Sequence, residues 1–298
     1  MKPPSGILDV DKPPGLTSRD AVNRVERLLG RAKCGHAGTL DPLATGVLVV
    51  CVEQATRLIQ YVQQLPKHYR AVFLLGRRSV TDDVEGEVEL LGEAPVPTLE
   101  EIEAALPQFL GDIQQRPPAH SAIKIAGQRA YDLARRGEDF ELAARKVSIY
   151  RLEILRYEYP ELELTIECGS GTYVRSLGRD LAAALGTAGV MASLVRTAIG
   201  HFRLEEAVQL DGLTSEEAIA RLQPPLEALR ALPRIDLTEK QLVELRHGRP
   251  ITLRGQTHPS ALPNQPAEWA GVDPAGNLAA ILFEKQPGVF WPARNFDA

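Results

Sequence analysis

Hydrophobic residues follow two different periods along this chain. Short apolar runs and alternation of apolar with polar residues predict strands at about residues 7–10, 47–52, 68–75, 147–149 and 162–168. The run over 47–52 is continuously apolar and rich in β-branched side chains. That composition is typical of a central strand that is buried on both faces.

Apolar positions spaced three or four residues apart predict helices at about residues 17–29, 55–65, 98–109 and 171–185. A short basic helix is also expected at about residues 128–136. Two of these helices begin with a capping box, Thr17 with Asp20 and Thr98 with Glu101. Residues 112–124 have no period and contain two adjacent prolines, so a loop is predicted there.

The order of these elements favours an α+β fold. Strands and helices mix without a regular βαβ repeat, so we expect a mixed, mostly antiparallel sheet with flanking helices. Prolines at 224, 225 and 233 among acidic residues suggest a boundary near residue 232. The segment beyond it contains both tryptophans and a turn sequence at 273–277 between apolar runs, which predicts a small β-rich unit.

Composition narrows the class of protein. The chain has 298 residues, 44% of them hydrophobic, and a net charge of −5, which is the profile of a globular protein and not of a disordered, collagen-like or membrane-spanning one. The first residues lack the apolar core of a signal peptide, and the three cysteines form no C-x-x-C pair. We therefore expect a protein of the reducing cytoplasm.

The charges are segregated along the chain. Residues 81–112 carry ten acids and no Lys or Arg, whereas residues 116–151 carry eight Lys and Arg against four acids. In an acidic protein, a basic stretch of this kind indicates a face for a polyanion. A solvated helix face with the same composition is the alternative.

The densest unusual segment is G-H-A-G-T-L-D-P-L-A-T-G at 35–46, next to the predicted buried strand. Its three glycines allow the backbone to approach a ligand closely, and a turn at Asp41-Pro42 would present the carboxylate. An Asp-Pro pair is also a common turn initiator, so its spacing alone leaves a purely structural role open.

Other ligand-binding patterns are absent from the sequence. The glycine-rich segment has neither P-loop nor dinucleotide-binding spacing. Cys34 and His36 lack the further ligands of a zinc deaminase. Asp82 and Asp83 are more typical of a solvated turn than of a magnesium site, so we expect no metal.

Five segments, in order, resemble the TruB family of tRNA pseudouridine synthases. They are G-I-L-D-V-D-K-P-P-G-L-T-S (6–18), G-H-A-G-T-L-D-P-L-A-T-G-V-L (35–48), K-H-Y-R-A (67–71), R-P-P-A-H-S-A-I-K (116–124) and G-T-Y-V-R-S-L-G-R-D-L (171–181). The resemblance implies an enzyme that isomerises uridine to pseudouridine at position 55, in the T loop of tRNA. The reaction is redox-neutral, so no cofactor is expected.

The resemblance also implies an organisation and a partner. Residues 1–231 would form the catalytic domain, with a thumb-like RNA-binding insertion at about 112–146, and residues 232–298 would form a small PUA-like RNA-binding domain. The expected partner is the T arm of tRNA. A monomer is expected, without a protein partner or membrane association.

Site residues carry over where the motifs match. Asp41 matches the catalytic aspartate and Arg175 the arginine that pairs with it. Tyr69 matches the residue that stacks on the flipped base, and Leu194 the apolar wall opposite. His36 is expected to contact the displaced RNA strand, and Lys12 to support the active-site loop or bind a phosphate. The basic residues of the insertion are expected to contact the T arm; they are Arg116, Lys124, Arg129, Arg135 and Arg136.

This chemistry explains the residue types. Breaking the N1–C1′ bond of uridine builds positive charge on the ribose, which an ionised carboxylate can stabilise, attack or relieve by removing a C2′ proton. A carboxylate in a dry pocket needs a cation beside it to stay ionised. One departure from the family occurs where Thr-x-Thr-x-Asp is usual and this chain has Ser-Val-Thr-Asp-Asp at 79–83; Asp83 still aligns, but a polar contact from position 80 is in doubt.

Two other functions compete with the enzyme. A tRNA-binding folding chaperone would keep the RNA surface without turnover, but binding alone does not require a buried Asp-Arg pair. A nucleotide-dependent metabolic enzyme would need a phosphate loop, and the sequence has none.

Overall fold

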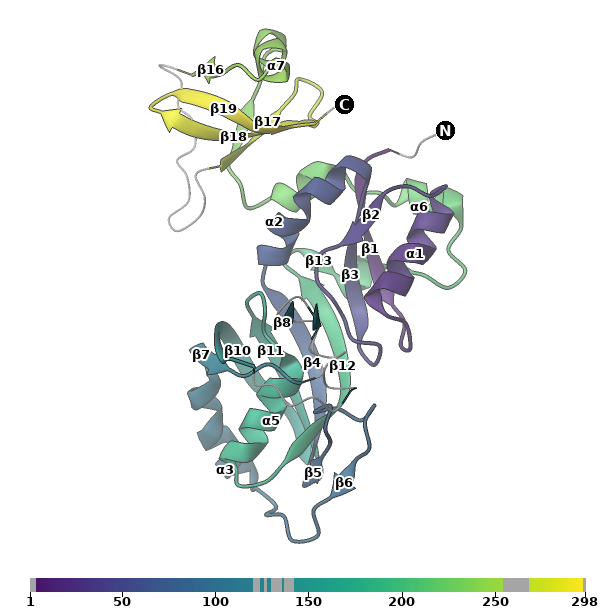
Figure 1. Cartoon of the computed structure of the whole chain (residues 1–298), viewed down its shortest axis with the longest axis vertical. Coiled ribbons are helices and arrows are strands. Elements are labelled where there is room, and N and C mark those ends of the chain that lie inside the picture. The colour runs from purple at the N-terminus through teal and green to yellow at the C-terminus, as the bar shows by residue number, and fades with distance from the viewer. Residues whose placement is uncertain are drawn as a thin grey trace.

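The computed structural model describes residues 4–119, 136, 142–253 and 268–296, and the backbone alone at 124–125 and 128–129. Figure 1 shows a long sheet flanked by helices, with a smaller sheet beyond one end of it. No helix in the described ranges is long and apolar enough to cross a membrane.

The large sheet has ten strands among the described residues, and most neighbours are antiparallel. Its order is β14 (Val208–Gln209), β1 (Gly6–Lys12), β3 (Thr45–Val52), β12 (Gly189–Ile199), β4 (Lys67–Leu75), β11 (Glu161–Cys168), β10 (Arg145–Glu158) and β7 (Gly111–Gln115), with β2 (Cys34–His36) on β3 and β13 (Phe202–Arg203) on β12. Only β1–β14 and β3–β12 are parallel pairs within it. The mixed, mostly antiparallel sheet is therefore confirmed.

Helices cover both faces of this sheet. The described helices are α1 (Ser18–Leu28), α2 (Ile59–Gln64), α3 (Leu99–Ala105), α5 (Val174–Ala184), α6 (Ser215–Ala220) and α7 (Glu239–Arg246), with 3₁₀ turns η1 (Glu53–Leu58), η2 (Leu106–Phe109), η3 (Leu204–Glu206) and η4 (Pro225–Leu229). Both predicted capping boxes are confirmed, at the starts of α1 and α3. The helix expected over 55–65 is 3₁₀ up to Leu58 and α-helical from Ile59.

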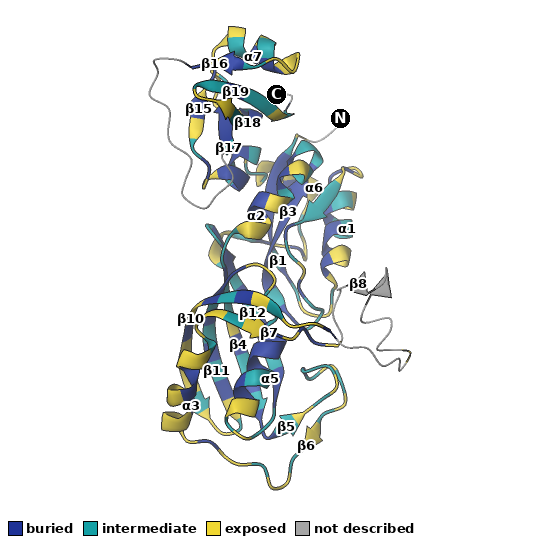
Figure 2. Ribbon diagram, turned by 60° about the vertical axis from the view of Figure 1, so that its left-hand side comes forward, coloured by how far each residue is buried: buried dark blue, intermediate teal, exposed yellow. Residues whose placement is uncertain are grey.

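Side chains of alternate residues along β1 and β3 pack into different layers. Leu8 and Val50 belong to the core beneath α1 and α6, whereas Ile7 and Val49 belong to the core beneath α2. At the other end of the sheet, α3 and α5 pack on β4, β11 and β10. Figure 2 shows the buried residues concentrated along these central strands, so the middle of the sheet is a rigid base for loops at its edges.

Two sequence expectations near the insertion are wrong. Residues 111–115 form the edge strand β7 rather than a loop, because they pair with Arg145–Ile149 of β10. The first residues of the basic helix expected at 128–136 instead form strand β9 (Gln128–Arg129), which pairs with β8 (Lys124–Ile125). In both places hydrogen bonds to a neighbouring strand decide the structure, and no hydrophobic period in the sequence reports them.

The C-terminal sheet begins at Arg234, close to the expected boundary. Its order is β15 (Arg234–Asp236), β17 (Glu268–Val272), β18 (Leu278–Gln286), β19 (Val289–Asn295) and β16 (Ile251–Thr252). One face surrounds Trp269 and Phe290, whose rings meet edge to face. Val272 on its other face shares a core with Leu58 of the large part, so the two parts pack directly on each other.

A short hairpin, β5 (Arg77–Arg78) with β6 (Glu89–Leu90), extends from the end of β4. The turn between its strands, residues 79–88, leans back on β12, where Val84 N donates to Met191 O at 3.1 Å. This contact places an acidic turn against β12 and beside α5, whose Arg179 pairs with Asp82.

Candidate active site

Lys12, the last residue of β1, connects the loop between β2 and β3, residues 37–44, to the segment that follows β1. The Nζ of Lys12 donates to the carbonyl oxygens of Pro13 at 2.9 Å, Leu16 at 2.7 Å and Pro42 at 3.4 Å. Burial lowers the pKa of Lys12 to about 8. Lys12 has no exposed surface, so of the two roles expected for it, supporting the loop fits and contacting a phosphate does not.

Two further side chains hold the same loop. Ser18 Oγ accepts from Leu40 N at 2.7 Å and donates to Leu40 O at 3.0 Å. From the other side, Arg196 of β12 donates through Nε to Val47 O at 2.7 Å and through Nη2 to Gly38 O at 3.0 Å. The loop is therefore fixed before any substrate binds, as electrostatic catalysis requires.

Arg175, the second residue of α5, pairs with the aspartate of this loop. Its Nη2 lies 2.9 Å from Asp41 Oδ2, its Nη1 lies 3.1 Å from Asp83 Oδ2, and Nη1 also donates to Thr81 O at 2.8 Å. The Arg175 side chain is 6% exposed and Asp83 3%, but Asp41 is 37% exposed. Asp41 thus has a buried cation behind it and an open side in front.

The 79–83 turn supplies the second carboxylate of this network. Ser79 Oγ donates to Asp83 O at 2.6 Å, and Thr81 Oγ1 donates to Asp83 Oδ1 at 2.6 Å. Val80 is 76% exposed and takes no part in these contacts. The doubtful contact from position 80 is therefore not needed, because Ser79 and Thr81 hold Asp83.

Four residues expected at the site line one cavity of about 180 Å³: Asp41, Tyr69, Arg175 and Leu194. The rest of its lining comes from the loop and from the start of α5, namely Thr39, Leu40, Thr172, Tyr173 and Val174. A cavity of this size suits one small group rather than a large ligand. Burial raises the pKa of Tyr69, so its hydroxyl stays protonated at neutral pH.

Comparison with known proteins matches this arrangement. A family model described as TruB family pseudouridylate synthase (N terminal domain) covers residues 26–174. A tRNA pseudouridine synthase B of an Arthrobacter species is 43% identical over 286 residues, which cover 93% of this chain and 92% of the relative. The chain belongs to the TruB family. A second member, from Caulobacter vibrioides, is 43% identical over 98% of this chain and 96% of its own.

Two solved structures contain chains whose fold is similar to that of this TruB family member. The crystal structure of a Cbf5-Nop10-Gar1 complex contains a chain that is 28% identical, with a TM-score of 0.71 over 93% of this chain and 78% of that chain. A chain in the structure of an H/ACA RNP bound to a substrate RNA is 24% identical and matches with a TM-score of 0.72, over 97% of this chain and 84% of that one. The second likeness concerns the fold alone.

The remaining expected residues lie outside the cavity or outside the described chain. His36 ends β2 beside the loop, and its pKa is lowered by burial and by Arg19 and Arg196 nearby. Of the insertion, Arg136 is exposed in a turn, the side chains at 124 and 129 are not described, and position 135 falls outside the described residues. Arg116, at the start of the insertion, is described and exposed.

Two residues of the site were missed in the sequence. Tyr173 lines the cavity, and Arg196, which is only 1% exposed, donates to Gly38 O in the loop and to Val47 O in β3. Tyr173 stands in the segment at 171–181 that carries the TruB resemblance, and Arg196 stands two residues after Leu194. The sequence signal for Arg196 is a charged residue within an apolar stretch, because an arginine is fully buried only where its guanidinium has hydrogen-bond or ion-pair partners. Among the described residues, no three His, Cys, Asp or Glu side chains gather as a metal site.

Proposed function

We propose that this protein converts uridine to pseudouridine at position 55, in the T loop of tRNA. The observation that carries the proposal is the ion pair between Asp41 and buried Arg175 at the wall of a small cavity that Tyr69 and Leu194 also line. Membership of the TruB family and relatives named tRNA pseudouridine synthase B support both the reaction and the RNA.

The reaction needs a carboxylate more than any other group. The N1–C1′ bond breaks, the uracil ring turns, C5 bonds to C1′, the proton on C5 leaves to solvent and N1 regains a proton. Asp41 stabilises the developing positive charge on the ribose, attacks C1′ or takes the C2′ proton. In each case Arg175 orients the carboxylate, because one guanidinium nitrogen lies 2.9 Å from Asp41 while the other is held 3.1 Å from Asp83.

Tyr69 and Leu194 hold the base. A uridine within a folded loop must leave the stack to reach Asp41, and the flipped base then needs a π-face and an apolar wall. Tyr69 on β4 provides the ring, and Leu194 on the adjacent β12 provides the wall. Tyr69 is partly buried, and its protonated hydroxyl has no charge to disturb this stacking.

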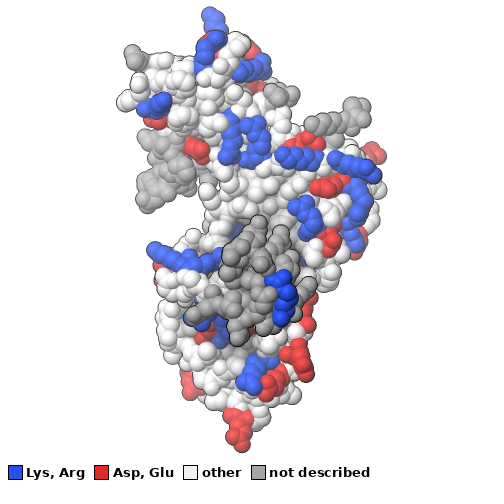
Figure 3. All heavy atoms as spheres, in the orientation of Figure 1, with Lys and Arg blue, Asp and Glu red and all other residues white. Residues whose placement is uncertain are grey.

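The basic insertion and the C-terminal unit bind the rest of the RNA. Lys and Arg side chains outnumber acidic ones on the upper part of the face in Figure 3, and acidic ones prevail at its lower end. We assign phosphate contacts to the insertion, including exposed Arg136, and a smaller share to residues 232–298. Reversing the charge at Arg136 should flatten the slope of log affinity against log salt by roughly 0.9 for each phosphate that is no longer neutralised. An unchanged slope would make the insertion a solvated face.

The decisive experiment is tritium release from tRNA transcript labelled at uridine C5, because loss of that hydrogen accompanies each turnover. Asp41→Asn should lower kcat by more than about 10³-fold and leave tRNA affinity nearly unchanged, since the carboxylate acts on the transition state. The matched control is Asp211→Asn, which changes an exposed aspartate paired with Arg24. Residual activity of the Asp41 variant within tenfold of the unaltered protein would refute the assignment.

The same variant tests the alternative of a folding chaperone. A chaperone without turnover would release no tritium even with Asp41 intact, while still accelerating the folding of tRNA. An enzyme that also helps tRNA to fold would lose only the first activity in Asp41→Asn. The Asp41–Arg175 pair favours the enzyme, because an RNA surface gains nothing from a carboxylate, which repels phosphate.

A further inference from the structure

The start of the basic insertion is tied to the wall of the cavity by a buried carboxamide. Gln115, the last residue of β7, has no exposed surface. Its Nε2 donates to Tyr173 O at 3.0 Å and its Oε1 accepts from Tyr173 N at 2.8 Å. One side chain thus makes the two hydrogen bonds that a neighbouring strand would make.

Tyr173 is a sensitive place for such a contact. It is the N-cap of α5, it makes no side-chain capping bond, and it stands two residues before Arg175. Gln115 therefore fixes the backbone at the start of α5, two residues before the arginine that pairs with Asp41.

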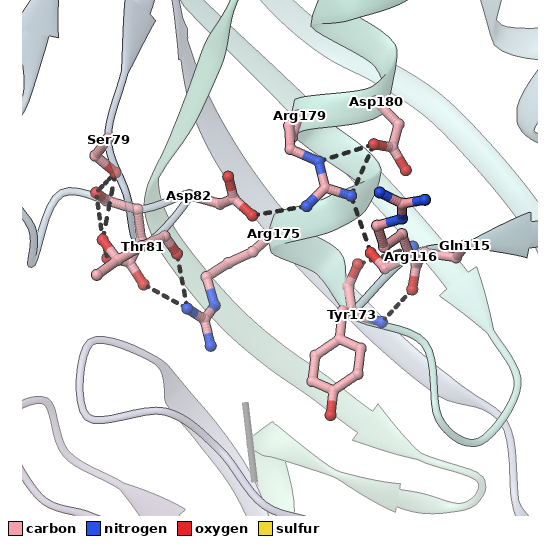
Figure 4. Close-up of polar contacts among 10 residues, drawn as sticks. Ser79, Thr81, Asp82, Gln115, Arg116, Tyr173, Arg175, Arg179 and Asp180 are labelled. Atoms are coloured by element: carbon pink, nitrogen blue, oxygen red, sulfur yellow. Dashed lines mark hydrogen bonds and ion pairs between the residues drawn. The ribbon is translucent and has the colours of Figure 1, made fainter. Parts of the chain in front are cut away.

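A second contact holds the turn that carries Asp83, the other carboxylate paired with Arg175. One turn further along α5, Arg179 donates through Nη1 to Asp82 Oδ2 and through Nη2 to Arg116 O, both at 2.9 Å (Figure 4). Asp82 neighbours Asp83, the other carboxylate that Arg175 contacts. Three segments, 79–83, 115–116 and 173–179, therefore meet around one arginine pair.

We propose that Gln115 is a positioning residue for the Asp41–Arg175 pair, with Arg179 holding the other side of the same network. Gln115 is not part of the cavity lining and has no surface to offer a substrate, so it acts only through Tyr173. The contacts it protects span 2.9 and 3.1 Å, and good hydrogen bonds extend only to about 3.2 Å, so a small shift of α5 would weaken them. The inference rests on the proposed roles of Asp41 and Arg175.

The test compares two neighbouring glutamines. Gln115→Leu removes both hydrogen bonds at similar volume, and Gln114→Leu makes the same change at an exposed position of the same strand. We expect kcat for tritium release to fall about 10- to 100-fold in Gln115→Leu, with KM changed less than about threefold, and neither to change in Gln114→Leu. Normal kcat, or a change in KM alone, would overturn the proposal even if the variant is less stable.

A second variant keeps the experiment informative if the leucine variant does not fold. In Gln115→Glu a protonated carboxyl can still donate to Tyr173 O and accept from Tyr173 N, whereas the ionised form cannot donate. Its kcat relative to the unaltered protein should therefore recover as the pH is lowered from 8 to 6, and a flat ratio would count against positioning. Asp41→Asn in the same assay separates the two proposals: if it is active, the proposed function fails, and if it is inactive while Gln115→Leu is normal, only the positioning role fails.

Discussion

Replacing Asp9 by asparagine should change how the stability of this protein depends on pH. Asp9 lies in the middle of β1 and is 3% exposed, and neither of its carboxylate oxygens has a hydrogen-bond partner among the described residues. Burial raises its pKa from 3.8 to about 7; Arg196 opposes the rise, and Glu206 and Asp11 add to it. At neutral pH and above, the fold must therefore hold a charge that is poorly solvated and accepts no hydrogen bond from the described residues.

The size of the effect follows from the two pKa values. A group whose pKa is higher in the folded state contributes stability that is present in full below pH 3.8 and is lost as the pH rises through about 7. The full loss is about 4 kcal/mol, of which about 2.5 kcal/mol falls between pH 5 and pH 8. An asparagine in this place does not titrate, so the Asp9→Asn variant should gain about 2.5 kcal/mol on the unaltered protein over that interval.

Urea unfolding at pH 5, 6, 7 and 8 measures this difference directly. The control is Asp236→Asn, at an exposed position of β15, whose stability relative to the unaltered protein should not follow the same curve. A constant difference between Asp9→Asn and the unaltered protein from pH 5 to pH 8 would refute the reasoning, because it would mean that Asp9 titrates alike in the folded and unfolded chains.

Three further predictions concern the site. Tyr69→Phe should keep nearly full tritium release, whereas Tyr69→Leu should lose roughly five- to 150-fold, because base stacking is worth about 1–3 kcal/mol; a phenylalanine variant as inactive as Asp41→Asn would give the hydroxyl a chemical role. Asp83→Asn breaks a buried ion pair with Arg175 and should cost about 3–5 kcal/mol of unfolding free energy in urea, and a loss below about 1 kcal/mol would contradict this. Lys12→Met removes a buried ammonium that binds three carbonyls, so kcat should fall while tRNA affinity, measured by filter binding, stays constant; weaker affinity would restore the phosphate contact.

Local signals in the sequence were sufficient for much of the fold. The continuous apolar run over 47–52 is a central strand with both faces buried, because only such a strand has no polar side to show to water. The capping boxes of α1 and α3 are confirmed, since each uses residues only three positions apart. Motifs of the TruB family are sufficient to identify Asp41 and its partner Arg175 from the sequence.

Strands held mainly by their neighbours were not predictable in the same way. Residues 111–115 have no hydrophobic period, yet they pair with β10 because an edge strand needs hydrogen bonds on one side more than it needs apolar side chains. Strand β12 was not predicted either. It lies between β3 and β4 in the sheet, and so carries Leu194 and Arg196 to the cavity and its loop.

The sequence by itself determined the strongly patterned strands, the capped helices and which residue types stand in the family motifs, because periodicity, capping and motif spacing are properties of a few consecutive residues. The tertiary structure alone decided which distant groups meet. Gln115 reaches the backbone of Tyr173, Arg175 is shared by Asp41 and Asp83, and Asp9 is buried with no hydrogen-bond partner among the described residues. Each of these depends on the relative position of strands and helices far apart in the chain, which packing of the whole core establishes and no short stretch of sequence encodes.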